Sequence, residues 1–307
     1  MLKRGHIVQF YPITLDDKPL IKPHLDAWHC GNSESSFANL MLWSEPWTIQ
    51  YALEDDVLFV RLQYKDGTKP PLLFAPLAKD DKADYCQAMN KAISYFEESG
   101  YPFVMKGVTK PLVDYIRLNC SDIYDIEADA NYAEYIYSVP DLMELAGKKY
   151  HGKRNHINRF LENNPEHTFA LMTEADVPEC KALYEKWVEG KEEEIVGLSD
   201  ERSSVMMALN HFQALDLIGG IVRIDGNVEA FTLGERVLPD MALIHIEKAN
   251  WEIQGLYPFI NREFLRHAFA DCAYVNREED MGIDGLRKAK LSYKPVKLLE
   301  KYIVSFA

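Results

Sequence analysis

The sequence predicts an α+β protein made of two consecutive units, each a mixed β-sheet flanked by helices. Three observations lead to this prediction. The chain has 307 residues, about twice the length of a common domain, for which ~150 residues is a usual figure. The order of helical and strand-like segments in its first half recurs in its second half. Hydrophobic residues make up 47% and charged residues 27%, the balance of a folded globular protein.

The first half mixes apolar patterns of the strand period and of the helix period. Residues 83–98 have helical spacing, because Tyr85, Met89 and Phe96 fall on one stripe and Gly100 follows as a stop signal. Residues 47–53 and 57–64 are strand-like and predict a β-hairpin. In chain order, the predicted elements are strand 7–13, helices 20–28 and 36–43, strands 47–53, 57–64 and 72–77, helix 83–98, strand 103–105, helix 110–118 and strand 132–139.

The second half repeats that order without a visible repeat of residues. Thr173 and Asp176 resemble a capping box, residues 225–227 form a hairpin turn signal, and Pro258 suits the first turn of a helix. In chain order, the predicted elements are strand 168–172, helices 173–188 and 203–215, strands 217–224, 228–237 and 241–246, helix 257–270, strand 274–275, helix 283–290 and strand 296–304.

This order, β-α-α-β-β-β-α-β-α-β, is that of GNAT acyltransferases, whose mixed sheet splays near its fourth strand. We therefore predict two tandem GNAT-like domains, residues 1–140 and residues 141–307. The second begins with a basic bridging helix over residues 141–163 and continues as the GNAT-like unit 164–307. Two unrelated α+β domains are the alternative.

Charge and cysteine content limit the function classes. The net charge is −14, which disfavours DNA as a partner, because nonspecific DNA binders are usually basic. No apolar run reaches the ~18 residues needed to span a bilayer, and the first residues lack the apolar stretch of a signal peptide. The expectation is a cytoplasmic protein. The cysteines are isolated and odd in number, so we expect five free thiols: Cys30, Cys86, Cys120, Cys180 and Cys272.

A basic strip at Lys148–Arg159 is the first segment with unusual chemistry. It contains five cations and no acid, so it forms a local anion site on an acidic background. Such a strip suits phosphates, an anionic lipid headgroup or an RNA backbone; a solvated helix that pairs with acidic neighbours explains it as well. The candidate residues are Lys149, His151, Lys153, Arg154 and Asn158.

Two further segments follow in the second half. Residues 276–295 combine acids, two glycines and a set of cations. The helix dipole explains the order of the charges but not the other residues of the segment. Residues 245–250 end a strand, and Gln254 and Gly255 lead into a helix whose N-terminal N–H groups could bind phosphate. The candidates from these segments are His245, Glu247, Lys248, Gln254, Gly255, Asn276, Arg277, Asp280, Arg287, Lys290, Ser292 and Tyr293.

Three blocks resemble a known family. They are DLMELAGKKYHGKRNHINRF (141–160), HIEKAN (245–250) and YVNREEDMGIDGLRKAKLSYKP (274–295). They are similar to the signature blocks of the C-terminal catalytic domain of bacterial phosphatidylglycerol lysyltransferases. The resemblance implies tandem GNAT-like domains joined by a basic helix and a relationship to Fem-type aminoacyltransferases, which use aminoacyl-tRNA. The acyl-CoA loop pattern of GNAT enzymes is matched at Gly255 but not at Glu252 or Tyr257.

Taken together, these features predict a transferase that moves an acyl or aminoacyl group to an amine or hydroxyl acceptor. Glu247 would act as general base and Tyr293 as proton donor to the leaving group, while Gln254, Gly255, Arg287 and Lys290 would hold donor phosphates. The donor is acyl-CoA or aminoacyl-tRNA; we expect no metal and no tightly bound cofactor. A non-catalytic anion-binding protein and a peripheral protein on anionic lipid are the alternatives.

Overall fold

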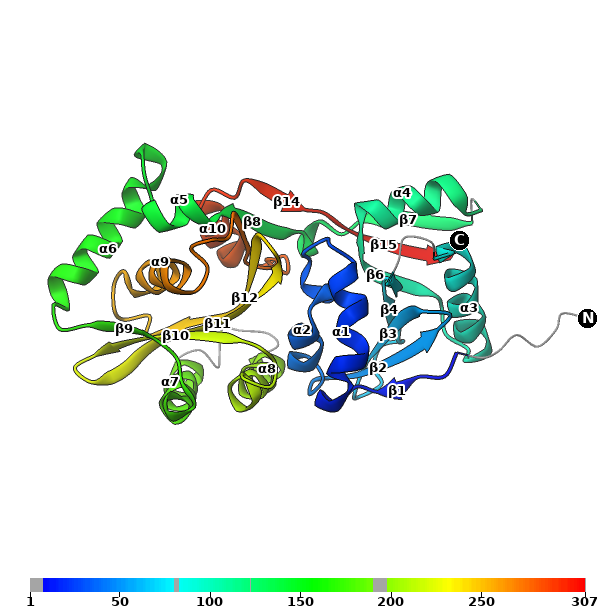
Figure 1. The fold of residues 1–307 in the computed structure, drawn as a ribbon, viewed down its shortest axis with the longest axis horizontal. Coiled ribbons are helices and arrows are strands. Elements are labelled where there is room, and N and C mark those ends of the chain that lie inside the picture. The colour runs from blue at the N-terminus through cyan, green and yellow to red at the C-terminus, as the bar shows by residue number, and fades with distance from the viewer. Residues whose placement is uncertain (1–7, 80–82, 122, 190–197, 307) are drawn as a thin grey trace, which may run out of the picture. The chain divides into compact units, whose positions relative to one another are not determined.

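The computed structural model describes residues 8–79, 83–121, 123–189 and 198–306 (Figure 1). It is an α+β structure in which mixed sheets are flanked by helices, as predicted. The chain forms two compact units: the first comprises Met1–Glu134 and Leu299–Ala307, and the second Tyr135–Leu298. In the described part of the chain, no helix combines the length and the apolar character needed to cross a bilayer.

The first unit is built on one sheet with the order β1-β2-β3-β4-β6-β15-β7, and β5 also pairs with β3. Among its described strand pairs, only β4 and β6 run parallel. Its strands are β1 (Tyr11–Pro12), β2 (Trp47–Glu54), β3 (Val57–Tyr64), β4 (Leu72–Phe74), β5 (Leu77–Ala78), β6 (Val104–Thr109), β7 (Tyr124–Ala128) and β15 (Lys301–Phe306). Its helices are α1 (Lys18–Ala27), α2 (Phe37–Leu42), α3 (Tyr85–Glu98) and α4 (Lys110–Asn119).

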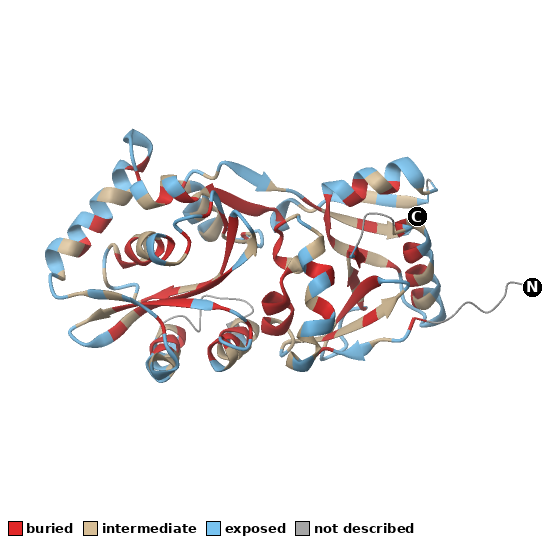
Figure 2. Ribbon diagram, in the orientation of Figure 1, coloured by how far each residue is buried: buried red, intermediate tan, exposed pale blue. Residues whose placement is uncertain are grey.

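Helix α3 shows how the sequence pattern builds the first core. The side chain of Asp84 accepts a hydrogen bond from the Gln87 amide and caps the helix. The predicted stripe of Met89, Phe96 and their neighbours is fully buried against β6 and α4 residues (Figure 2). The apolar face thus positions the helix, as its 3.6-residue period predicts.

The second unit is built on a sheet with the order β14-β8-β13-β12-β11-β10-β9. Helix α9 covers one face, and α7 and α8 cover the other (Figure 1). The strands are β8 (Glu134–Ser138), β9 (Thr168–Leu171), β10 (Ile218–Ile224), β11 (Asn227–Leu238), β12 (Met241–Ala249), β13 (Tyr274–Asn276) and β14 (Lys297–Leu299). The helices are α5 (Val139–Glu144), α6 (His151–Asn163), α7 (Val177–Glu189), α8 (Leu198–His211), α9 (Leu256–Ala268) and α10 (Asp284–Ser292).

The two units divide the chain differently from the expected boundary at residue 140. Strand β8, expected as the last strand of the first unit, pairs with β13 of the second. The expected final strand 296–304 is two strands: β14 lies beside β8, and β15 inserts between β6 and β7 of the first unit. A short apolar strand carries no sequence signal for the sheet edge on which it pairs, so the pattern placed each strand with its neighbours in sequence.

Smaller differences follow from short or irregular segments. Strand β7 was not predicted: Tyr124, Ile126 and Ala128 alternate with exposed acids, but the segment has only five residues and none of them is buried. The predicted strand 72–77 is broken into β4 and β5. Of the predicted strand 7–13, only Tyr11–Pro12 is a strand, and Ile7 lies outside the described residues.

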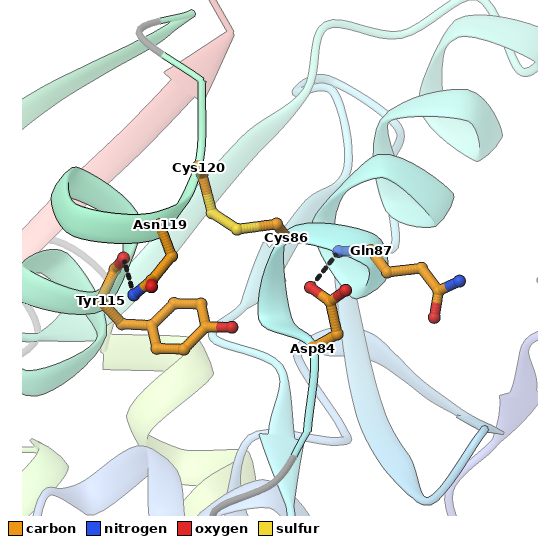
Figure 3. Close-up of a disulfide and its surroundings, with 6 residues drawn as sticks. All are labelled: Asp84, Cys86, Gln87, Tyr115, Asn119 and Cys120. Carbon is orange, nitrogen blue, oxygen red and sulfur yellow. Dashed lines mark hydrogen bonds between the residues drawn. A yellow bond between two sulfur atoms is a disulfide. The ribbon is translucent and has the colours of Figure 1, made fainter.

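A disulfide joins Cys86 in α3 to Cys120, which directly follows α4 (Figure 3). The expectation of five free thiols was therefore wrong for this pair, while Cys30, Cys180 and Cys272 are free. The two cysteines are 34 residues apart in sequence, and spacing alone does not reveal that α3 and α4 lie side by side. The bond closes a loop around β6 in the first unit.

Breaking this disulfide should destabilise the first unit. For a loop of this length, chain entropy predicts a loss of about 3–4 kcal/mol in the free energy of unfolding. We expect that loss in the Cys120→Ser variant, measured by urea unfolding without reductant. Cys30→Ser, which removes a free thiol of the same unit, is the matched control and should change stability by less than about 1 kcal/mol. Equal stability of Cys120→Ser and the parent would show that the bond does not form.

Candidate active site

Strand β12 contains a one-residue bulge at His245. Leu233 of β11 lies opposite Ile246, but the next residue, Gly234, lies opposite Ile244, so His245 is the extra residue. A bulge shifts the alternation of side chains by one position and bends the strand. Beyond the bulge, Glu247 and Ala249 consequently join Ala242 and Ile244 on the face covered by α9.

The His245 ring is clamped between two carboxylates. Its Nδ1 lies 2.9 Å from Glu278 Oε1 and its Nε2 lies 2.9 Å from Glu235 Oε1, and the side chain is 1% exposed. Because carboxylates only accept, both nitrogens must donate and the ring is an imidazolium. Burial alone would lower the pKa of His245, but the hydrogen bonds to Glu235 and Glu278 raise it from 6.5 to about 10.

Gly234 provides the room for this bulge. A Cβ atom at Gly234 would lie 2.6 Å from the carbonyl oxygen of Leu243. The backbone of β12 therefore lies closer to β11 than a residue with a side chain at position 234 would permit. His245 and Gly234 together act as structural residues, which place Glu247 rather than react.

The parallel partner of β12 ends where the bulge begins. Strand β13 pairs with β12 only from Met241↔Tyr274 to Leu243↔Asn276, whereas β12 continues to Ala249. One edge of residues 245–249 therefore lacks a neighbouring strand on the β13 side. We call this stretch the open edge of β12.

Four side chains gather beside the open edge: Glu247, Arg277, Tyr293 and Lys153. Glu247 Oε1 accepts from Arg277 Nη2 at 2.9 Å, and Glu247 Oε2 accepts from Asn261 Nδ2 at 2.9 Å. The Arg277 guanidinium lies 4.6 Å from the centre of the Tyr293 ring, and Lys153 Nζ lies 3.6 Å from the same centre. Each oxygen of Glu247 keeps a lone pair, so the carboxylate could still accept a proton.

Two cations in this cluster have N–H groups without a hydrogen-bond acceptor among the described residues. Arg277 Nη1 is buried without a hydrogen-bond partner in the described chain. For Lys153, the described residues supply a ring contact but neither a hydrogen bond nor an ion pair. Burial and the nearby Arg277 lower the pKa of Lys153 to about 8, with Glu247 acting in the opposite direction. Buried donors without partners are costly, so the cluster favours an incoming oxygen-rich ligand.

The Tyr293 hydroxyl stays protonated in this setting. Burial raises the pKa of Tyr293 far above its ordinary value, as it does for the neighbouring Tyr137. A neutral phenol can donate a hydrogen bond or a proton, which is the role that the sequence analysis proposed for Tyr293. Asn261 and Tyr137 were not among the sequence candidates; each lies on an ordinary helix or strand face, and only the fold brings it to Glu247 or Tyr293.

The predicted phosphate-binding residues Arg287 and Lys290 contact the protein itself. Arg287 donates to both carboxylate oxygens of Asp280, at 2.8 and 2.9 Å, and these bonds lower the pKa of Asp280 to about 2. Lys290 donates to the carbonyl oxygens of Arg277 and Glu278. Both side chains thus attach α10 to the segment after β13 and hold Arg277 in place.

Helix α6 covers the turn at Gly255. A Cβ atom at Gly255 would lie 2.0 Å from the carbonyl oxygen of His156, and the residue has a φ of +86°. The glycine is thus required by packing and by backbone conformation. Gln254 beside it is exposed, Ser292 donates to the Ala289 carbonyl, and Asn276 is buried and accepts from the Glu278 amide.

The basic strip does not form one cationic face. Lys149 pairs with Asp141 at 2.7 Å, Arg154 donates to the carbonyls of Leu145 and Gly147, and Lys153 alone reaches Tyr293. His151 contacts Asn155 on the exposed side, where Asn158 also lies.

Lys248 points to the opposite face of β12 from Glu247. It pairs with Glu201 at 2.7 Å and lies 3.8 Å from the centre of the Trp187 ring. A separate hollow of about 480 Å³ runs along α10 and contains none of the four clustered side chains. The described residues hold no group of three or more His, Cys, Asp or Glu side chains arranged for a metal ion.

The His245 clamp should make stability depend on pH. Its folded pKa of about 10 exceeds the unfolded value of 6.5, so its contribution is complete below pH 6.5 and is lost as the pH rises toward 10. We expect the parent to lose on the order of 4 kcal/mol across this window. Lys153 has a lowered pKa of about 8, so its contribution to stability rises as the pH increases above 8. To isolate the effect of His245, urea unfolding of the parent is therefore compared with that of His245→Gln.

The His245→Gln variant should be less stable than the parent at pH 6.5, with the difference shrinking by pH 9.5. His151→Gln, which changes an exposed histidine of α6, should keep the parental dependence. A constant difference between His245→Gln and the parent would contradict the charged clamp.

Comparisons with known proteins agree with this architecture. A conserved protein of unknown function from Bacteroides thetaiotaomicron is 34% identical, with a TM-score of 0.89 over 98% of this chain and 100% of that chain. The C-terminal domain of a putative lysylphosphatidylglycerol synthetase from Agrobacterium fabrum has a TM-score of 0.63 at 12% identity, covering 95% and 92%. FemX has a TM-score of 0.63 at 9% identity, covering 97% of both chains.

The two more distant structures show a common fold and no more. The family evidence is separate: the model described as "Phosphatidylglycerol lysyltransferase, C-terminal" matches residues 28–305, which includes the three signature blocks and both units. With a match over most of its length and the predicted GNAT-like sheets in place, this chain belongs to the phosphatidylglycerol lysyltransferase C-terminal family.

Proposed function

We propose that the chain transfers an acyl or aminoacyl group from a phosphate-bearing donor to an amine or hydroxyl acceptor at the open edge of β12. Its family and its fold are those of acyl- and aminoacyltransferases. The observation that carries the proposal is the convergence of Glu247, Arg277, Tyr293 and Lys153 beside β12. These groups supply one carboxylate, two cations and one neutral phenol, the set that acyl transfer requires.

The proposed reaction assigns one task to each group. The acceptor N–H or O–H loses its proton to Glu247 while its lone pair attacks the donor carbonyl. Arg277 and Lys153 stabilise the oxygen that becomes negative, because their charges face a site with few competing partners. The bond between the carbonyl carbon and the leaving oxygen or sulfur then breaks, and Tyr293 gives its proton to the leaving group. Glu247 afterwards releases its proton to solvent and Tyr293 takes one up, which restores both residues.

The donor would be acyl-CoA or aminoacyl-tRNA, and exposed cations in α6 and in the turn before it offer a way to test which. Lys148 and Arg159 are exposed, and no ion pair of theirs occurs among the described residues. A tRNA backbone would extend well beyond the reacting carbonyl and could contact such cations, whereas the smaller CoA would not need them. An anionic lipid could use the same face, as a site for the acceptor.

Glu247→Gln and Tyr293→Phe should each reduce turnover strongly. A positioned acid or base contributes about 10²–10⁴-fold, so we expect losses in that range with donor affinity changed less than threefold. Steady-state kinetics with acyl-CoA and with aminoacyl-tRNA measure both quantities.

Glu252→Gln and Tyr274→Phe are the matched controls, because both side chains are exposed and lie outside the cluster. They should keep the parental turnover. Full turnover in Glu247→Gln and Tyr293→Phe would remove both residues from the mechanism. Donor binding without transfer by the parent would instead favour the non-catalytic alternative.

Reversing the exposed charges Lys148→Glu and Arg159→Glu together should separate the two donors. If the donor is aminoacyl-tRNA, kcat/KM should fall about tenfold or more and depend less steeply on salt. With acyl-CoA, kcat/KM should stay within about twofold. Lys65→Glu with Lys110→Glu, both exposed in the first unit, controls for the change in net charge. Unchanged tRNA-dependent transfer would show that this face does not bind the donor.

A further inference from the structure

Tyr257 lies on the same face of α9 as Asn261, which forms a hydrogen bond with Glu247. It lies in the first turn of α9, four residues before Asn261, whose side chain donates to Glu247 Oε2 at 2.9 Å. Residues four apart share one face of a helix. The Tyr257 ring therefore points toward β12 and not toward the exposed side of α9.

The hydroxyl oxygen of Tyr257 faces two N–H donors. Trp187 Nε1–H donates to it at 3.2 Å, and the backbone N–H of Ala249 lies near enough to act on the pKa of the same hydroxyl. Since both groups are donors, the hydroxyl's own proton points away from them. Burial raises the pKa of Tyr257, so the proton remains bound at neutral pH. The described residues provide no acceptor for it.

The position of the Ala249 amide locates this hydroxyl. The amide of Asn250 donates to Glu229 in β11 at 2.8 Å. Neighbouring amides of a strand point to opposite edges, so the Ala249 amide points to the open edge of β12. Glu247 is two residues earlier, about 7 Å along the strand. The Tyr257 hydroxyl and the Glu247 carboxylate thus flank one stretch of the open edge.

Trp187 is held so that its indole N–H reaches Tyr257. Lys248 Nζ lies 3.8 Å from the centre of the Trp187 ring and pairs with Glu201 at 2.7 Å. The Tyr184 ring stacks on Trp187 at 5.9 Å. A cation and an aromatic ring on one indole limit its rotation. Lys248, a sequence candidate for the site, therefore acts on the Tyr257 side through Trp187.

We propose that Tyr257 is a catalytic hydrogen-bond donor to the carbonyl oxygen of the transferred group. The inference rests on the proposed transfer reaction and adds a donor on the open edge, beyond Glu247, Arg277, Tyr293 and Lys153. The phenol keeps its proton throughout: it donates a hydrogen bond to the carbonyl oxygen, most strongly while that oxygen is negative in the tetrahedral intermediate. The Trp187 and Ala249 N–H groups direct that proton to the substrate.

The test compares Tyr257→Phe with Trp187→Phe. Tyr257→Phe removes the proposed donor and should lower kcat about 10- to 100-fold with a nearly unchanged KM for the donor substrate. Trp187→Phe removes one N–H group but leaves the phenol, so it should lower kcat less than threefold. Equal losses in the two variants, or full turnover in Tyr257→Phe, would overturn the proposal.

A second measurement does not depend on turnover. The indole ¹⁵N–H signal of Trp187, assigned as the one missing in Trp187→Phe, reports on the hydroxyl next to it. Titration with acetyl-CoA and with a 3′-aminoacylamino-adenosine, a stable mimic of an aminoacyl-tRNA end, should shift this signal in the parent and in Glu247→Gln but not in Tyr257→Phe. Binding of a probe without any shift in the parent refutes the role of Tyr257 alone, whereas failure of both probes to bind refutes the proposed function and this inference with it.

Discussion

The imidazolium of His245, held between Glu235 and Glu278, is the interaction on which the geometry of the second unit depends. It occupies the extra position of the β12 bulge, and that one residue decides which face each later side chain takes. Without the bulge, Glu247 would point toward α7 and α8, and Lys248 would point toward α9. A buried charge is tolerated here because two carboxylates compensate it, although removing any one partner would leave an unpaired charge.

Charge in the second unit is organised around the segment that follows β13. Asp280 accepts two hydrogen bonds from Arg287, Lys290 donates to the carbonyls of Arg277 and Glu278, and Glu278 binds His245. These three contacts fix the backbone at Arg277 and directly after it. Most charges that looked like ligand-binding groups therefore hold Arg277 in position. Among the described residues, Arg277 Nη1 and Lys153 Nζ have no hydrogen-bond acceptor, so these donors have spare capacity for a ligand. Positioning and binding are divided between different cations.

The sequence supported the fold better than the details of the site. Apolar periodicity and turn residues located nearly every helix and strand, because those signals are local. It could not show that β8 and β15 join sheets remote in sequence, or that Cys86 meets Cys120, because both depend on contacts between distant segments. Glu247, Arg277, Tyr293 and Lys153 were all candidates, yet a residue type does not reveal its partner. Arg287 and Lys290 looked equally suited to phosphate until the structure gave them protein acceptors.

The first unit offers an internal comparison, because its sheet also contains a one-residue register shift like the bulge of β12. Its β3 pairs Leu62 with Leu72 and Arg61 with Leu73, but Leu58 with Leu77, so one extra residue lies between β4 and β5. Parallel pairing of β4 with β6 ends at Phe74, as that of β12 with β13 ends at Leu243. The side chains at this break, Ala75, Leu77 and Ala78, are buried and apolar. The first unit thus has the irregular strand but fills it with its own apolar core, in keeping with the proposal that the reaction takes place in the second unit.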